Sequence, residues 1–375
     1  MKRISIQPRK NWESIVEGMG FNYHSKYWNE KAYYKFTIGQ IENIEHAINE
    51  LEYICMEAVQ HIIDENLFEQ LAIPNIARQR IIDSWNNDEL SLYGRFDLAY
   101  SGQGDVKLIE YNADTPTSLF EASVIQWQWL QDKFPKNDQF NGIHEKLIAT
   151  WKSRNYKKNI HFAFLSDNPE DVANCLYMAD TAYQAGYIVN SLDIEDIGSD
   201  GNKFFGENEL EIDTLFKLYP WEMIWGDKFG EVINKCSTLF IEPPWKLLLS
   251  NKGILALLWK MFPEHKNLLP AYTENNLPSG LQGKFVKKPF FSREGANVSL
   301  GNFKNDNFIV EKENQGDYGA PFVFQEYFEL PIFEDEISPI LGGWVVDGTA
   351  IGIGVREDKG ITGNMSNFVP HLIGD

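Results

Sequence analysis

Cysteine and long apolar runs are scarce in this sequence, and each scarcity excludes a class of protein. The 375 residues include 3 cysteines, Cys55, Cys175 and Cys236, which lie far apart without a Cys-x-x-Cys pair. We therefore expect neither a cysteine zinc site nor a disulfide framework, and a reducing cytoplasm fits this usage. The best apolar run, residues 253–262, is short and contains Lys260. We expect no membrane span and no export signal.

Basic residues are also in the minority. The chain has 34 Lys and Arg against 54 Asp and Glu, a formal net charge of −20. A protein of this charge repels phosphate backbones, so we expect no binding to nucleic acid. Hydrophobic residues make up 43% and aromatic residues 14% of the chain, which is typical of a packed globular protein. The length suits one large catalytic unit or two to three closely associated lobes.

Hydrophobic periodicity predicts both helices and strands. Apolar residues follow the three-and-four spacing of an amphipathic helix over residues 41–67. A strand at 161–165, a helix at 172–185 and a strand at 187–192 predict a parallel β-α-β unit. The C-terminal third predicts strands at 284–288, 322–328, 341–346 and 349–355, with a mobile surface loop at 305–317. The predicted fold class is therefore α/β in the first part and α+β in the last.

A predicted β-hairpin, residues 93–100 and 106–112, carries the strongest candidate site. Alternate side chains of a strand share a face, so Arg95 lies beside Asp97 and Glu110 beside Asn112. If these side chains meet across the hairpin, Asp97, Glu110 and Asn112 offer the oxygen ligands that Mg²⁺ accepts alongside nucleotide phosphates and water. Arg95 would then neutralise an anionic substrate.

A surface hairpin with ordinary charges is the alternative interpretation of this pattern. Leu108, Ile109 and Tyr111 surround Glu110 in the sequence, which favours burial of its carboxylate. A buried carboxylate without a partner costs several kcal/mol, on the order of the values for isolated ions. Burial would therefore require a cation beside Glu110.

Two further polar segments follow strands. A helix is predicted to start at Pro116, with Thr115 as its cap and with Ser118 and Glu121 at the spacing of a capping box. The hydroxyl and backbone N–H groups of Thr115-Pro-Thr-Ser118 could hold a carboxylate or phosphate there or simply cap the helix. The turn from Ser292 to Asn297 contains Gly295 and could close over phosphates, although such turns are common. Before it, Lys287 and Lys288 point to opposite faces, and periodicity does not decide which one reaches a nucleotide.

Taken together, the motifs resemble those of the glutathionylspermidine synthase family. They are YGRFD, KLIEYNADTPTSLFEA, IEPPW with SNKGILALLW, KKPFFSREGANV, FQEYFELP and GGWVVDGTAIGIGVRED, spread from about Leu92 to His371. The resemblance implies a pre-ATP-grasp α/β lobe and an ATP-grasp lobe within residues 1–375, with the nucleotide lobe at about 250–375. It also implies an enzyme that joins a small acid, which can be peptide-like, to an amine at the expense of ATP.

The resemblance also implies roles for individual residues. The ligands of two Mg²⁺ ions would be Asp97, Glu110 and Asn112. The catalytic cations around the transferred phosphoryl group would be Arg95, Arg293 and Arg356. The ATP-binding residues would be Lys252 and Lys288 at the phosphates and Gln325, Glu326 and Tyr327 on the adenine side. The substrate-binding residues would be Thr115 and Thr117, with Glu170 and Asp171.

Two departures from the family pattern limit what carries over. The enzyme that names the family has an amidase domain with a Cys-His pair, and no such pair precedes the first motif here, so we expect no hydrolysis of the product. Asn367 stands nearest to the position where that enzyme has a carboxylate for the polyamine, so spermidine is not carried over as a substrate. Two rival interpretations are a non-catalytic nucleotide-binding protein and a hydrolase that uses Asp97 and Glu110 as acid and base.

Overall fold

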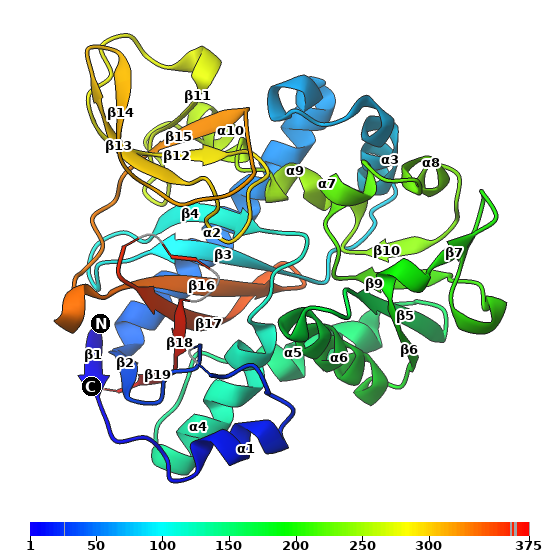
Figure 1. The fold of residues 1–375 in the computed structure, drawn as a ribbon, viewed down its shortest axis with the longest axis horizontal. Helices are drawn as coiled ribbons and strands as arrows, with labels where there is room; N and C mark the ends of the chain where they lie inside the picture. The colour runs from blue at the N-terminus through cyan, green and yellow to red at the C-terminus, as the bar shows by residue number, and fades with distance from the viewer. Residues whose placement is uncertain (26, 361, 364–365, 375) are drawn as a thin grey trace.

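A five-stranded antiparallel sheet lies at the centre of the molecule and combines early and late segments of the chain (Figure 1). In the computed structural model, which describes residues 1–25, 27–360, 362–363 and 366–374, its strand order is β18–β17–β16–β3–β4. The strands are β3 (Tyr93–Ala99), β4 (Lys107–Asn112), β16 (Ser338–Val346), β17 (Thr349–Asp358) and β18 (Asn367–Val369). The predicted hairpin is confirmed, with Asp97 opposite Glu110 and Arg95 opposite Asn112.

Helix α2 (Ile38–Asp64) packs on this sheet and confirms the predicted amphipathic helix. A capping box starts it: the Thr37 side chain accepts from the Gln40 backbone N–H, and the Gln40 side chain accepts from the Thr37 N–H. The apolar face of the helix is buried, and the helix packs closely against β16. A Cβ atom added to Gly343 would lie 2.6 Å from Cδ1 of Ile48, so this contact requires a residue without a side chain.

A parallel sheet forms an α/β lobe beside the central sheet, green in Figure 1. Its order is β10–β9–β5–β6, made of β5 (Asn159–Phe164), β6 (Ile188–Asp193), β9 (Thr214–Lys217) and β10 (Leu239–Ile241). The crossover from β5 to β6 runs through α6 (Pro169–Gln184), as the predicted β-α-β unit requires. From β5 the chain continues to β6 on one side and later to β9 on the other side, so the direction of strand addition reverses between β5 and β9. In such sheets ligands bind beyond the carboxyl ends of the strands at the reversal.

A second antiparallel sheet, yellow to orange in Figure 1, has the order β11–β15–β12–β13–β14. Its strands are β11 (Ala271–Thr273), β12 (Gly283–Pro289), β13 (Ser299–Lys304), β14 (Asn307–Glu313) and β15 (Phe322–Glu326). The predicted loop at 305–317 is wrong, because most of it is β14, paired with β13. The side chains of β14 are largely exposed and many are polar, so the sequence pattern is that of a loop although the backbone pairs.

The two ends of the chain share a small sheet of β1 (Lys2–Ser5), β2 (Ala32–Phe36) and β19 (His371–Ile373). Further helices are α1 (Trp12–Gly18), α3 (Asn75–Asn86), α4 (Gln126–Lys133), α5 (Ile143–Ser153), α7 (Trp221–Ile224), α8 (Gly230–Ile233), α9 (Leu247–Ser250) and α10 (Ile254–Met261). Within the described ranges, no helix is both long and apolar enough to cross a membrane.

The helix after the hairpin begins at Leu119, so its predicted start at Pro116 is wrong. Ser118 has a φ of 66° and its hydroxyl lies 2.8 Å from the Tyr27 hydroxyl, so it does not form the expected capping box. The cap comes from α6 instead, because Oδ1 of Asn174 accepts from the N–H of Leu119 at 2.8 Å. The segment before Leu119 is thereby left outside the helix, where the Thr117 backbone oxygen accepts from Arg95 of the hairpin.

We predict that Gly343→Ala destabilises the fold, because its methyl group would overlap Ile48. Overpacking of this kind costs about 1–3 kcal/mol. Gly39→Ala is the matched control, since an added Cβ there meets nothing within 4 Å. Urea denaturation of both variants measures the free energy of unfolding. Equal values for the two variants would contradict the close contact between α2 and β16.

Candidate active site

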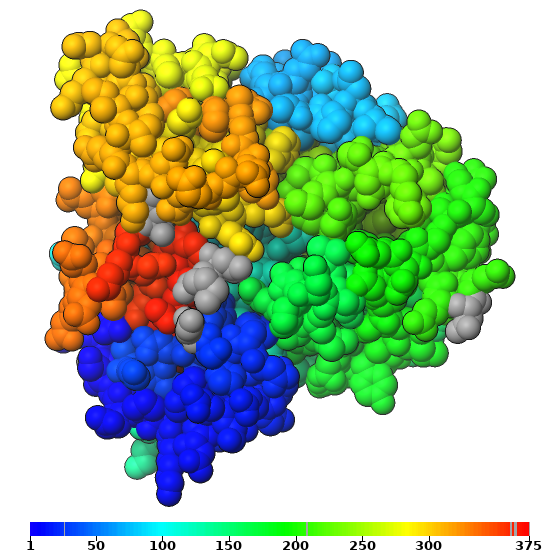
Figure 2. Space-filling model, viewed as in Figure 1, coloured from blue at the N-terminus to red at the C-terminus, as the bar shows by residue number. Residues whose placement is uncertain are grey.

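A cavity of about 390 Å³ opens where the central sheet, the α/β lobe and the β11–β15 sheet meet. In Figure 2 the yellow and orange surface of the β11–β15 sheet abuts the green surface of the lobe. The cavity lining includes these predicted site residues: Arg95, Asp97, Glu110, Asn112, Thr115, Thr117, Asp171, Lys252, Lys288, Arg293, Gln325, Glu326, Tyr327 and Arg356. Glu170 is outside this lining, at the start of α6.

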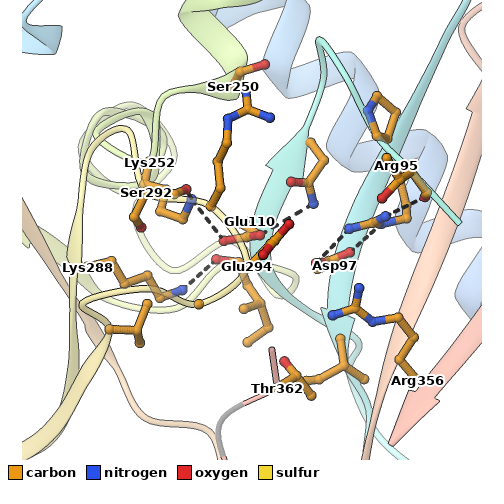
Figure 3. A pocket seen from close by; sticks show the side chains of 18 of the residues that line it. Arg95, Asp97, Glu110, Ser250, Lys252, Lys288, Ser292, Glu294, Arg356 and Thr362 are labelled. Atoms are coloured by element: carbon orange, nitrogen blue, oxygen red, sulfur yellow. Dashed lines mark hydrogen bonds and ion pairs between the residues drawn. The ribbon is translucent and has the colours of Figure 1, made fainter. Parts of the chain in front are cut away.

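Arg95 and Asp97 form a two-pronged ion pair on β3 (Figure 3). Nε of Arg95 donates to Oδ1 of Asp97 at 2.8 Å, and Nη2 donates to Oδ2 at 3.3 Å. Nη1 of Arg95 donates to the backbone oxygen of Thr117 at 2.7 Å. Each nitrogen of the guanidinium thus has a partner, which fixes its orientation at the cavity wall.

Glu110 lies between cations that come from other elements. Nζ of Lys252 is 3.4 Å from its Oε2, and Nδ2 of Asn112 is 3.4 Å from its Oε1. Burial alone would raise the pKa of Glu110, but the charges of Lys252, Lys288 and Arg95 together lower this pKa to about 2. The carboxylate is therefore ionised, and the expected neighbouring cation is present.

Lys288, and not Lys287, points into the cavity. Its Nζ donates to Oε1 of Gln325 at 2.7 Å and to the backbone oxygen of Ile109 at 2.8 Å. Burial lowers the pKa of Lys288 to about 8. Lys287 lies instead over the ring of Phe322, with Nζ 3.7 Å from the centroid. Periodicity alone did not distinguish the two lysines. In the structure, the face of β12 that carries Lys288 is the face turned toward the hairpin and the cavity.

Two arginines complete the cationic lining from opposite sides. Nη2 of Arg293, in the turn after β12, donates to Oε1 of Glu222 at 2.9 Å, and Nη1 donates to Oγ1 of Thr115 at 3.0 Å. Nη2 of Arg356, on β17, donates to the backbone oxygen of Gly363 at 3.1 Å. Arg356 therefore keeps a neutral partner, whereas Arg293 is bound to a carboxylate.

The acidic loop at the start of α6, residues 166–171, contributes Asn168 and Asp171 to the cavity lining. Burial, with the negative charge of Glu170 beside it, raises the pKa of Asp171 to about 7. Oδ1 of Asn168 caps the helix by accepting from the N–H of Glu170 at 3.0 Å. Asp171 thus faces the cavity about half protonated near pH 7, and a cationic ligand group would favour its ionised form.

The donor set on the hairpin fits Mg²⁺ held jointly with phosphates. No cluster of three or more His, Cys, Asp or Glu side chains suited to a metal occurs among the residues that the structure describes. Mg²⁺ in nucleotide sites usually takes one or two carboxylates and completes its shell with phosphate and water. Asp97 and Glu110, opposite each other on β3 and β4, supply those carboxylates, and Asn112 adds an amide oxygen.

Sequence reasoning missed three charged residues next to the cavity. Nζ of Lys217, at the end of β9, lies 2.6 Å from Oδ1 of Asp114, and both side chains are fully buried. Glu222, in α7, binds Arg293. Asp114 is adjacent to Thr115, but Lys217 follows 103 residues later, and no sequence pattern links the two. The motif LYPWE, residues 218–222, was the available signal for a polar turn after a strand.

Comparison with known proteins identifies the family of the chain. A family model described as Glutathionylspermidine synthase preATP-grasp matches residues 3–374. The chain belongs to the glutathionylspermidine synthase family. The resemblance inferred from the motifs is confirmed, and membership makes the chain an enzyme of the ligase class.

The relatives differ in length. A Haemophilus influenzae protein named "Putative acid--amine ligase" is 43% identical, over 99% of each chain. The Crithidia fasciculata trypanothione synthetase is 27% identical over 84% of this chain and 52% of its own length. The bifunctional glutathionylspermidine synthetase/amidase of Escherichia coli is 24% identical over 92% of this chain and 60% of its own length. The chain thus spans little more than half of these two longer relatives.

The fold also has a solved counterpart. A glutathione synthetase-like effector from Globodera pallida superposes with a TM-score of 0.53 over 98% of this chain and 100% of that chain, at 10% identity. At this identity the likeness concerns the fold alone. The predicted ATP-grasp type of fold, with α/β and α+β parts, is confirmed.

Glu121, at the π-helical turn Glu121–Ile125 before α4, is buried next to the acidic loop. Its Oε1 accepts from the Tyr23 hydroxyl at 3.1 Å, while Oε2 is buried and has no hydrogen-bond partner among the residues that the structure describes. Burial, followed by repulsion from Glu170, raises the pKa of Glu121 to about 8. The folded protein therefore holds this proton to a higher pH than the unfolded chain does.

We predict a pH-dependent stability from this carboxyl group. Because its pKa is raised from 4.5 to about 8, its contribution to stability is complete below pH 4.5 and is lost as the pH rises through 8. Glu121→Gln cannot titrate, so wild-type stability should fall relative to the variant across this window. Glu231→Gln, with an exposed side chain, is the control. Denaturation at a series of pH values measures both, and a constant difference for Glu121→Gln would disprove the prediction.

Proposed function

We propose that the enzyme is an ATP- and Mg²⁺-dependent carboxylate–amine ligase that forms an amide through an acyl phosphate. The observation that carries the proposal is the convergence of cations on the paired carboxylates of one hairpin. These cations are Arg95, Lys252, Lys288, Arg293 and Arg356, and they come from elements far apart in the sequence. The lining holds six Lys and Arg side chains and six Asp and Glu side chains, a high share of cations for a chain with a net charge of −20, which suits a polyanionic ligand that carries Mg²⁺. The names of the relatives support the same class of reaction.

The chemistry explains why the cations are needed. A free carboxylate resists attack by an amine, so it is first converted to an acyl phosphate by transfer of the γ-phosphoryl group of ATP. This transfer depends on positioning and on charges placed around the phosphoryl oxygens. In the proposal, Arg95, Arg293 and Arg356 supply those charges, and Lys252 and Lys288 bind the nucleotide phosphates. Gln325, Glu326 and Tyr327 would hold the adenine, and residues 250–375 would form the nucleotide lobe.

The remaining predicted residues bind the metal and the substrates in this proposal. Asp97, Glu110 and Asn112 would hold two Mg²⁺ ions, which would neutralise charge on the ATP phosphates. Thr115 and Thr117 would hold the acid substrate beside the hairpin, and Glu170 and Asp171 would act at the substrate end of the cavity. The fixed orientation of the Arg95 guanidinium means that little reorganisation precedes the transfer.

The hydrolase alternative requires one carboxyl group to act as an acid. A general acid needs a raised pKa, as in the paired carboxylates of glycosidases. The surrounding cations instead lower the pKa of Glu110 to about 2, and both oxygens of Asp97 accept from Arg95. Glu110 is therefore not suited to donate a proton near neutral pH, and both oxygens of Asp97 are already engaged by a guanidinium.

We predict that Arg95→Ala lowers ATP-dependent ADP release by about 10³-fold, the order expected for an arginine at a phosphoryl transition state. Arg78→Ala, outside the cavity lining, is the control. The assay measures ADP against a grid of small acids and peptides crossed with amines, with ATP and Mg²⁺ omitted in turn. Circular dichroism confirms that each variant is folded. Turnover of Arg95→Ala at the wild-type rate, or turnover without ATP, would refute the proposal.

A second prediction concerns the intermediate. If an acyl phosphate forms, one oxygen of the substrate carboxylate leaves with the phosphoryl group when the amine attacks. With an ¹⁸O-labelled acid substrate, the inorganic phosphate should therefore carry one ¹⁸O atom per turnover. Mass spectrometry of the phosphate measures the label, and unlabelled phosphate accompanied by amide formation would rule out this route.

A further inference from the structure

The turn between β12 and β13 is tied to the α/β lobe through Arg293. Its guanidinium has two acceptors on that side, Oε1 of Glu222 and Oγ1 of Thr115. Nε of Arg293 also donates to Oε1 of Glu222, at 3.2 Å. The second oxygen of Glu222, Oε2, is buried and accepts no hydrogen bond within the described part of the chain. The Arg293–Glu222 contact is therefore the charged link by which the turn reaches the lobe across the cavity.

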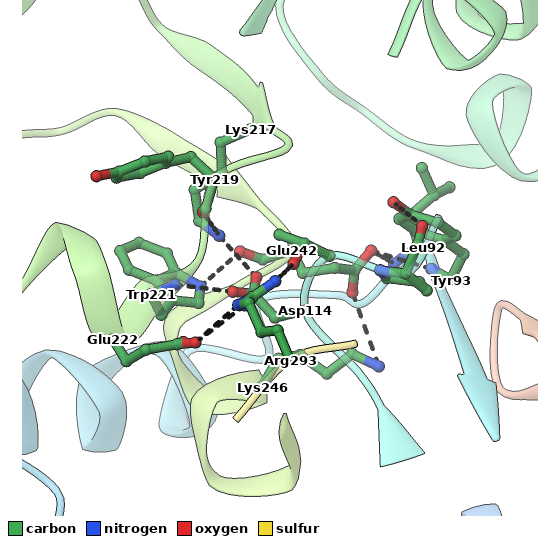
Figure 4. A network of polar contacts seen from close by, with 12 residues as sticks. Leu92, Tyr93, Asp114, Lys217, Tyr219, Trp221, Glu222, Glu242, Lys246 and Arg293 are labelled. Atoms are coloured by element: carbon green, nitrogen blue, oxygen red, sulfur yellow. Dashed lines mark hydrogen bonds and ion pairs between the residues drawn. The ribbon is translucent and has the colours of Figure 1, made fainter. Parts of the chain in front are cut away.

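The two acceptors of Arg293 are held at a fixed separation by a buried network (Figure 4). Asp114, next to Thr115, accepts at Oδ1 from Nζ of Lys217 at 2.6 Å and at Oδ2 from the N–H of Trp221 at 2.8 Å. Trp221 is next to Glu222 in the chain. The hydrogen bond from Trp221 to Asp114 thus links the residue before Thr115 to the residue before Glu222.

Other contacts hold the network itself in place. Nζ of Lys217 also donates to the backbone oxygen of Tyr219 at 3.1 Å and lies 4.3 Å from the centroid of the Trp221 ring. The indole N–H of Trp221 donates to the backbone oxygen of Glu242 at 3.1 Å. A buried ion pair adds little net stability but can fix one geometry. The geometry fixed here is that of the two acceptors.

The turn is anchored on its other side as well. Nδ2 of Asn314 donates to the backbone oxygen of Gly295 at 3.1 Å, and Oδ1 of Asn297 accepts from the N–H of Tyr318 at 2.7 Å. Glu294 and Asn297 both have a φ of 54°, which is unfavourable for residues with side chains and persists only where contacts enforce it. The turn therefore spans the cavity between two anchors, one on the β11–β15 sheet and one at Glu222.

We propose that Glu222 is a positioning residue that holds Arg293 over the cavity, and that the Asp114–Lys217 pair fixes the position of Glu222. This Arg293–Glu222 contact is called the dock. This inference rests on the proposed function, in which Arg293 stabilises the transferring phosphoryl group. Glu222 does not touch that group. It holds the guanidinium near Thr115, where the acid substrate would lie, so that the cation is in place before the phosphoryl group arrives. Preorganised charges of this kind need no rearrangement during the reaction.

Proteolysis tests the dock without any substrate. Trypsin must bind the Arg293 side chain to cut after it, so the Glu222 contact should protect the full-length enzyme at this bond. Glu222→Gln should raise the rate of cleavage after Arg293 about tenfold, in line with one lost hydrogen bond to a charged group. Glu211→Gln, which breaks the exposed Lys203–Glu211 pair of the same lobe, should leave the rate unchanged.

Thr115→Val removes the other acceptor and should raise the same cleavage rate a few-fold. Mass spectrometry identifies the cut, and cutting throughout the chain would reveal an unfolded variant. The Thr115→Val result keeps the test valid if Glu222→Gln fails to fold. Wild-type protection of Arg293 in each folded variant would overturn the dock.

A double-mutant cycle then separates positioning from a direct role. In the ADP-release assay, Glu222→Gln should lower kcat about tenfold in the wild-type background and have no effect in the Arg293→Gln background. Equal effects in both backgrounds would show that Glu222 acts independently of Arg293 and would overturn the inference. If Arg293→Gln alone keeps wild-type kcat, the proposed role of Arg293 fails, while the cleavage result still decides whether the dock exists.

Discussion

Positive charge that is buried in one cavity needs partners, and this constraint organises the whole site. Isolated charges cost several kcal/mol or more on transfer from water, so each cation here has an ionic or a hydrogen-bonding partner. Arg95 has Asp97, Lys252 has Glu110 and Arg293 has Glu222. The carboxylates come from the hairpin and the α/β lobe, and Lys252 and Arg293 come from segments that flank the cavity. The lobes are therefore joined across the cavity by charge pairs.

Local parts of this arrangement could be predicted from the sequence. The β3–β4 hairpin places Arg95, Asp97, Glu110 and Asn112 by strand alternation and by pairing across a short turn, and both are local rules. The α2 helix and the β-α-β unit are equally local. Each depends on a pattern within some thirty residues, roughly the size of one supersecondary unit, and each appears in the structure as predicted.

Non-local features could not be predicted in the same way. The pairing of β16 with β3 joins Gly342 to Asp97, and the sequence carries no signal for a partner so distant. The cap at Leu119 comes from Asn174, although Thr115 and Ser118 were the local candidates. Strand β14 looks like a loop because its exposed side chains lack alternation. In the first two cases a distant segment supplies the hydrogen-bond partner, whereas β14 pairs with the neighbouring strand β13 without the side-chain alternation that would have revealed it.

The partners of the cations divide them into two groups with different consequences. Arg95, Lys252 and Arg293 face carboxylates, so their fields are largely cancelled within a few ångströms as long as no ligand is bound, and Lys252 and Arg293 also join the segments that flank the cavity. Lys288 and Arg356 face neutral oxygens, those of Gln325, Ile109 and Gly363. A hydrogen bond to a neutral acceptor leaves the net charge of the cation in place, so these residues supply the field that attracts an anion into the cavity. One set of charges thus fixes the shape of the site, and the other set determines the sign of its ligand.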